Sequence, residues 1–172
     1  EEQLENKKIG GRLYGLPVGS SSSVGLIYNK EIFDGLGIAV PKSMDEFYRV
    51  CGLLQENGYT PLYVSDKDAW TATIGFSASV SQIMTDEDYE KLMSGEMRWD
   101  NERYCSILED FAALRTEGYT NPDYIEATYD SAVQAVASGS AAMYMSGQFF
   151  INDVQELSPE MELGMTAVPY RG

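Results

Sequence analysis

Short apolar runs bounded by glycine, proline or polar residues recur along the chain, and they predict the strands of a sheet. Runs of this length are typical of buried strands. The predicted strands are Arg12–Val18, Val24–Tyr28, Pro61–Val64, Ala141–Met145 and Leu163–Val168. The first of them contains Pro17 and fits either a short strand or an extended crossing. Residues 1–9 are polar and indicate a helix end or a frayed start, and Gly19–Ser23 indicates a flexible loop.

Apolar residues recur at intervals of three and four in the segments between these strands, and this spacing predicts helices. One helix begins at a capping box of Ser43 and Glu46 and ends at Gly58. Its apolar stripe consists of Phe47, Val50, Leu53 and Leu54. A second helix, Asn101–Glu117, carries a stripe of Tyr104, Ile107, Leu108, Phe111 and Leu114. The other predicted helices are Lys30–Leu36, Trp70–Met84, Glu87–Met93, Tyr129–Ala137 and Phe149–Leu157.

The alternation of strands and helices predicts an α/β fold, a sheet flanked by helices. The helix Trp70–Met84 is mostly apolar and is expected to be buried on several sides. The chain has 172 residues, of which 44% are hydrophobic, so it can form one domain with a real core. We find no internal repeat, low-complexity tract or interior linker in residues 1–172.

The charge of the chain excludes several kinds of partner. Its formal net charge is −15, and an acidic surface repels phosphate backbones and anionic lipid headgroups, so we expect no nucleic acid and no polybasic membrane contact. No apolar run approaches the roughly 18 residues of a membrane span. A signal peptide is either absent or already removed.

The residue inventory gives no support for an enzyme. The chain has no histidine, which excludes Ser-His-Asp and Cys-His catalysis and most zinc sites. It has no phosphate-binding loop, nucleophile elbow or metalloprotease motif, and we expect no cofactor. The acidic groups at Asp66/Asp68 and at residues 86–88 lack the pattern of a calcium loop and are expected to be solvated. Cys51 and Cys105 are expected to be buried free thiols rather than a bridge.

Two local features are candidates for ligand binding, because each follows a predicted strand and begins a helix. In open α/β sheets ligands bind outside the carboxyl ends of the strands. Asp68 and Trp70 follow the strand Pro61–Val64, and a tryptophan face can stack on a sugar while a carboxylate accepts from its hydroxyls. The alternative is that Trp70 belongs to the core and Asp68 caps the helix. The segment Gly147-Gln148-Phe149 has the same position after its own strand.

Several segments, taken in order, resemble the extracellular solute-binding proteins of sugar ABC importers. They are GGRLYGLPV, GLIYNKEIF, VPKSMDEF, AVASGSAAMYMSGQF and LGMTAVPYRG, and the resemblance extends over residues 9–172. It implies a periplasmic-binding-protein-like fold, in which two α/β lobes are joined by hinge-crossing strands and hold the ligand between them. Residues 1–172 would form a single α/β lobe, the second one, with hinge segments at its ends. The first lobe and the C-terminal helices would then lie outside this chain.

The resemblance also implies positions for ligand contacts. Trp70 falls where the family places a stacking aromatic, and Asp68 where a polar or acidic residue bonds a hydroxyl. Phe149 stands where many members have tryptophan, and Gln148 replaces a frequent proline after Gly147. Tyr28 and Ser23 lie in the crossing region, where further contacts are expected. Asn29 is expected to have a structural role at the start of the next helix.

These observations favour a binding protein that takes up a sugar by hinge closure and delivers it to the permease of an ABC importer. Such a protein would be extracytoplasmic, periplasmic or a cell-surface lipoprotein, with any lipid anchor outside this chain. Two alternatives remain from the sequence alone. One is a glycoside hydrolase with two carboxylates near Trp70. The other is a structural or interaction module whose aromatic residues all belong to the core. Full burial of Trp70 would favour this module over a binding protein.

Overall fold

A four-stranded sheet forms the centre of the fold. The computed structural model describes residue 4, residues 7–16 and residues 22–170. The strand order is β4 (Thr60–Tyr63), β5 (Ala141–Gly147), β3 (Val24–Asn29) and β6 (Leu163–Thr166). β4 is parallel to β5, whereas β3 is antiparallel to both β5 and β6. The carboxyl ends of β4, β5 and β6 therefore lie at one edge of the sheet, beside the beginning of β3.

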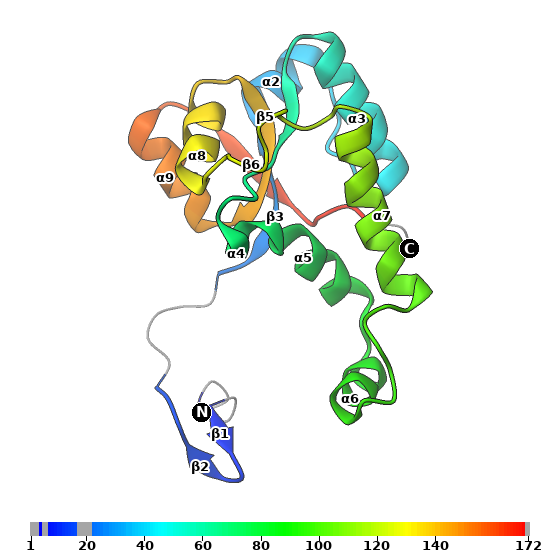
Figure 1. Ribbon diagram of the computed structural model, residues 1–172. Helices are drawn as coiled ribbons and strands as arrows, with labels where there is room; N and C mark the ends of the chain where they lie inside the picture. Colours follow the sequence, from blue (N-terminus) through cyan, green and yellow to red (C-terminus); the bar gives the residue numbers. More distant parts are fainter. Residues whose placement is uncertain (1–3, 5–6, 17–21, 171–172) are drawn as a thin grey trace.

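Helices cover both faces of this sheet, which confirms the predicted α/β class. In Figure 1, α8 and α9 lie on one side of the sheet and α3 and α7 on the other, with α4 and α5 near the carboxyl edge. The helices are α2 (Lys30–Leu36), α3 (Met44–Glu56), α4 (Ala69–Ala72), α5 (Ile74–Ile83), α6 (Asp86–Ser94), α7 (Glu102–Thr116), α8 (Tyr129–Ala137) and α9 (Phe149–Leu157). No helix within the described residues is both long and apolar enough to cross a bilayer.

The core is divided by the sheet into two layers, because successive side chains of a strand point to opposite faces. Leu26 of β3 packs with α2, α3 and α7, whereas its neighbour Ile27 packs with α8 and α9. A third, smaller cluster around Val80, Tyr104 and Ile107 joins α5 to α7. Most residues of the two predicted stripes belong to these clusters, but Leu53 and Leu108 are about half exposed and lie outside the core.

The single helix predicted over Trp70–Met84 is two helices, α4 and α5, and they are less buried than expected. The break is at Thr73, which ends α4 and begins α5. The Thr73 hydroxyl donates to the carbonyl of Trp70 at 3.0 Å, and the Thr71 hydroxyl donates to the carbonyls of Ser65 and Asp68. Such local side-chain bonds compete with a continuous helix. Along these two helices only Thr71, Ser79 and Val80 are fully buried.

The beginning of the chain also differs from the prediction. β1 (Lys8–Ile9) and β2 (Arg12–Leu13) form a separate antiparallel hairpin, so residues 8–9 belong to a strand and the strand predicted from Arg12 ends at Leu13. Gly10 and Gly11 have φ values of 57° and 77°, as a two-residue hairpin turn requires. Residues 17–21 lie outside the described residues, and Ser22 and Ser23 have no regular structure, in line with the predicted loop.

The two cysteines are free, and they should differ in reactivity. Cys51 is fully buried in α3, and burial raises the pKa of its thiol to about 12, whereas Cys105 on α7 is only partly buried, contrary to our expectation. Because the thiolate is the reactive form, we expect a disulfide reagent at pH 8 to modify Cys105 first and Cys51 only as the chain unfolds. Peptide mass spectrometry of partly modified protein measures this, with Cys105→Ser as the control. Rapid modification of Cys51 in the folded variant would contradict the packing.

Candidate functional site

Three aromatic rings meet at the carboxyl edge of the sheet, and we refer to Trp70, Tyr129 and Phe149 as the aromatic cluster. The ring centroids of Trp70 and Tyr129 are 5.2 Å apart, and Phe149 lies 6.2 Å from each of them. Trp70 is 48% exposed and Phe149 is 41% exposed. Trp70 is therefore not a core residue. Its exposure gives no support to the alternative in which all the aromatic residues belong to the core.

The topology of the sheet brings these rings together. Trp70 is in α4, shortly after β4, and Phe149 is the first residue of α9, shortly after β5. Since β4 and β5 are parallel neighbours, the segments that follow them begin side by side. Tyr129 is the first residue of α8, which packs beside α9 on the same face. Each ring thus stands at the first or second residue of a helix.

Buried hydroxyl groups fix the segment between β4 and α4. The hydroxyls of Ser65 and Tyr144 are hydrogen-bonded at 2.7 Å, and the Thr71 hydroxyl donates to the Ser65 carbonyl. Burial raises the pKa of Tyr144 to about 12, although the bond to Ser65 acts in the opposite direction. Tyr144 therefore stays protonated at neutral pH and can serve as a structural hydrogen-bonding group under the cluster.

Two carboxylates contact Tyr129. Oδ2 of Asp68 accepts from the backbone N–H of Tyr129 at 2.7 Å, and Oδ2 of Asp153 in α9 accepts from the Tyr129 hydroxyl. Burial and then the bond to Asp153 raise the pKa of Tyr129 well above its usual value, so the hydroxyl is a donor at all physiological pH values. Asp68 occupies the N-cap position of α4, but its side chain does not cap that helix.

The segment after β5 is shaped by a close approach between two of its own residues. A Cβ on Gly147 would overlap the ring of Phe149, so glycine is needed for the ring to fold back over the end of the strand. The backbone N–H of Gln148 donates to the carbonyl of Ser23 at 3.0 Å, which joins this segment to the start of β3. The Gln148 side chain is exposed.

The structure therefore brings six of the seven predicted site residues to one edge of the sheet. They are Trp70, Asp68, Phe149, Gln148, Gly147 and Ser23. Tyr28 is the exception, since it lies toward the other end of β3, pairs with Met143 and packs its ring on Phe33 at 4.8 Å. We therefore no longer place Tyr28 at the site. Asn29 accepts from the N–H of Ile32 at 3.2 Å and caps α2, as predicted.

Sequence reasoning missed Tyr129 and Asp153. Tyr129 follows the capping residue Thr128 and begins a helix, so it shares its position with the two rings that were chosen. It follows a loop rather than a strand, so the pattern of a strand followed by a helix does not include it. Asp153 is one of many acidic residues and has no distinguishing pattern around it.

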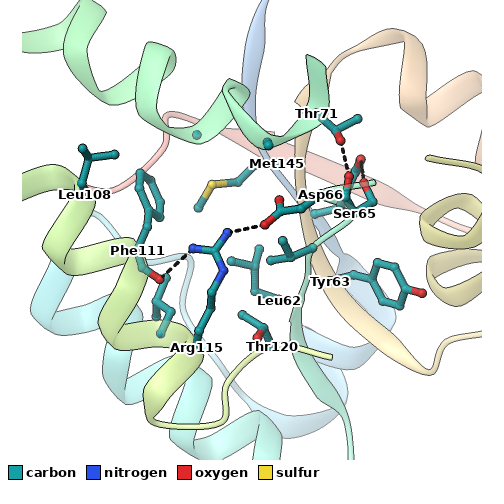
Figure 2. Close-up of a pocket in the computed structure, with 15 residues that line it drawn as sticks. Leu62, Tyr63, Ser65, Asp66, Thr71, Leu108, Phe111, Arg115, Thr120 and Met145 are labelled. Atoms are coloured by element: carbon teal, nitrogen blue, oxygen red, sulfur yellow. Dashed lines mark hydrogen bonds and ion pairs between the residues drawn. The ribbon is translucent and has the colours of Figure 1, made fainter. Parts of the chain in front are cut away.

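A cavity of about 200 Å³ lies on the other side of α4, between β4, α5 and α7 (Figure 2). Inside it the guanidinium of Arg115 pairs with Oδ2 of Asp66 at 2.8 Å and also donates to the carbonyl of Phe111 at 3.3 Å. Asp66 is therefore paired rather than solvated. Neither Trp70 nor Asp68 lines this cavity, so it is separate from the aromatic cluster.

The other acidic group has a structural role as well. Asp88 completes a capping box with Thr85 at the start of α6 and pairs with Arg103 at 2.8 Å, and these bonds lower its pKa. Among the described residues, no cluster of three or more Cys, Asp or Glu side chains is arranged to hold a metal ion.

Comparison with known proteins identifies relatives over nearly the whole chain. The family model for bacterial extracellular solute-binding proteins matches residues 2–170. The chain is 32% identical over 138 residues to an uncharacterised ABC transporter extracellular-binding protein of Pyrococcus horikoshii, covering 79% of the chain and 31% of that protein. It is 27% identical over 173 residues to the melibiose/raffinose/stachyose-binding protein MelE of Bacillus subtilis, covering 96% of the chain and 39% of MelE. The chain thus spans well under half the length of these relatives.

A solved structure supports the fold. The sugar transporter of Bacillus licheniformis in complex with stachyose has a TM-score of 0.74 at 20% identity, covering 88% of this chain and 41% of that one. This similarity confirms the predicted periplasmic-binding-protein-like α/β fold. The matched family and these relatives are binding proteins of transport systems rather than enzymes, which agrees with the absence of catalytic motifs and gives no support to the glycoside hydrolase alternative.

Proposed function

Because the chain belongs to the bacterial extracellular solute-binding protein family, we propose that it is the carbohydrate-binding lobe of a receptor that delivers sugar to an ABC importer. The observation that carries this proposal is the aromatic cluster, in which Trp70, Tyr129 and Phe149 from three helices meet at the carboxyl edge of the sheet. Aromatic faces supply contact area for the apolar face of a sugar ring, while nearby polar groups orient its hydroxyls.

A second lobe would complete the site. Trp70 and Phe149 keep nearly half of their surface exposed, so the cluster has a side that another part of the protein can cover. The relatives are more than twice as long as the matched region, which leaves room for such a lobe. Closure of the two lobes would exclude water and strengthen the hydrogen bonds to the sugar, and the closed form would be the one that the permease recognises.

The ligand we propose is an α-galactoside of the raffinose type. MelE is named for binding melibiose, raffinose and stachyose, and the similar Bacillus licheniformis structure contains stachyose. Trp70 and Phe149 are both partly exposed and come from different helices, which suits a ligand with more than one sugar ring. Membership of the family implies an extracytoplasmic location, and we propose attachment through a lipid anchor outside this chain.

Isothermal titration calorimetry of the full-length gene product tests this function. We expect stachyose or raffinose to bind and to raise the melting temperature, because a ligand that binds only the folded state stabilises it. The 172-residue chain alone should bind the same sugar much more weakly, since it lacks the opposing wall of the site. Absence of binding to any of a panel of oligosaccharides would contradict the proposed function. Equally tight binding by the chain alone would contradict the two-lobe mechanism.

A further inference from the structure

We infer that Asp68 is a positioning residue that holds Trp70 against Tyr129. The inference rests on the proposed function for its effect on affinity. It assigns to Asp68 a role that differs from the one expected from the family resemblance. The basis is the hydrogen bond between Oδ2 of Asp68 and the backbone N–H of Tyr129, at 2.7 Å, between residues 61 positions apart.

The chemistry of the Tyr129 N–H explains why a carboxylate is placed there. Tyr129 is the first residue of α8, and the first N–H groups of a helix have no carbonyl partner within that helix. A negative charge at this end is also favoured by the helix dipole. Thr128 bonds the N–H of Ser131 and leaves the N–H of Tyr129 to another acceptor. Asp68, the residue before α4, supplies that acceptor.

The position of Trp70 depends on such a link because α4 is weak by itself. The helix has only four residues, ends at Thr73 and has Thr71 as its one buried residue. Helices this short have little stability of their own. The segment before it is tied to the chain that leads into α8 by two backbone bonds, from Asp66 N–H to the Tyr124 carbonyl at 2.8 Å and from Lys67 N–H to the Ala127 carbonyl at 3.2 Å.

Asp68 continues this series with its side chain. Residues 66, 67 and 68 each bond the segment 124–129 in turn, and the last bond is the one nearest to Trp70. Removing the Asp68 side chain would leave the two backbone bonds and the bond from Thr71 to the Ser65 carbonyl in place, and would break the side-chain bond that joins the start of α4 to α8. A loss of the ring contact without loss of the fold is therefore the expected effect.

The partner ring is itself held at its far end. Its hydroxyl donates to Asp153 of α9, so Tyr129 is bound by carboxylates at both its backbone and its phenol oxygen. One carboxylate joins α8 to α4 and the other joins α8 to α9, the helix that carries Phe149. The hydrogen bonds from Tyr129 to Asp68 and to Asp153 thus link the three helices that carry the rings of the aromatic cluster.

Asp68→Asn and Asp68→Ala separate positioning from sugar contact. Asparagine keeps an oxygen that can accept from the Tyr129 N–H, whereas alanine removes the acceptor. Residues 1–172 contain two tryptophans, Trp70 and Trp99. In full-length protein that carries Trp99→Phe, Trp70 is therefore the one tryptophan left in residues 1–172. We expect Asp68→Asn to keep the near-ultraviolet circular dichroism of the ligand-free protein and to bind stachyose within about threefold of the parent. Asp68→Ala should change that spectrum and weaken binding about tenfold or more.

Asp130→Ala is the matched control, since it removes an exposed carboxylate from the first turn of the same helix. It should leave the spectrum and the affinity unchanged. Equal losses of affinity in Asp68→Asn and Asp68→Ala, with the ligand-free spectrum of both unchanged, would show that Asp68 contacts the sugar and would overturn the inference. If the parent binds no sugar, the proposed function fails. The ligand-free spectra then still decide the positioning role: a change confined to Asp68→Ala supports it, and no change overturns it.

Discussion

Replacing Trp70 with alanine in the full-length protein is expected to cost about 1–3 kcal/mol of sugar binding, a loss of roughly 5- to 150-fold in affinity. The indole is half exposed, it lies within 5.2 Å of the Tyr129 ring, and it sits at the edge of the sheet where the site is open. Its loss removes the largest face of the aromatic cluster. Calorimetry with stachyose and with raffinose measures the change.

Trp99 provides the matched control for this substitution. It is 54% exposed and its ring contacts those of Phe76 and Tyr104 in tilted arrangements, so it resembles Trp70 in exposure and in ring contacts. Both of its partners belong to the smaller core cluster between α5 and α7 rather than to the aromatic cluster. We expect Trp99→Ala to leave sugar affinity unchanged. An unchanged affinity in Trp70→Ala, or equal losses in both variants, would remove Trp70 from the binding site.

The helix ends could be predicted from sequence because the bonds that define them are local. Ser43 accepts from the N–H of Glu46 at 3.3 Å, as the capping box predicts. The carboxylate of Glu46 reaches back to the N–H of Lys42 at 2.8 Å, one residue before the cap. Both bonds join residues within four positions, so composition and spacing alone were sufficient to locate the start of α3.

The aromatic cluster could be predicted only in part, because its contacts join distant segments. Trp70 and Phe149 were identified by their position after strands, which is a local pattern. Their contact with Tyr129 depends on α8 packing beside α9 and on β4 lying next to β5. The spacing of residues along the sequence predicts neither of these arrangements. The same holds for Asp68, whose position before a helix indicated a cap, whereas its partner is a backbone group 61 residues away.

Burial along a helix was also only partly predictable. The stripe on α3 contains adjacent leucines, and periodicity placed both in the core. In the structure Leu54 is 0% exposed and packs in the cluster with α2 and β4, whereas Leu53 is 48% exposed. Adjacent residues are about 100° apart around a helix, so the width of the covering layer decides which of them is buried.

This difference gives a second large expected effect, on stability. Leu54→Ala should lower the free energy of unfolding by about 2–5 kcal/mol, because it removes two buried methyl groups and the carbon that carries them and leaves a cavity in the core cluster that also contains Leu62 and Met143. Domains are stabilised by only about 5–15 kcal/mol, so this variant should lose a large part of its stability. Urea unfolding of the 172-residue chain, followed by circular dichroism, measures the change.

Leu53→Ala is a closely matched control, since it makes the same chemical change at the adjacent position of the same helix. Alanine favours the helix at both sites, so propensity does not separate the two variants. A half-exposed leucine already contacts water and leaves no closed cavity when truncated, so we expect a loss below about 1 kcal/mol. Leu54→Met, which nearly conserves volume, should cost less than about 1.5 kcal/mol and keeps the comparison measurable if Leu54→Ala does not fold. Equal losses in Leu53→Ala and Leu54→Ala would mean that α3 is rotated on the sheet relative to the packing described above. The residues it presents to β4 and β5 would then have to be reassigned.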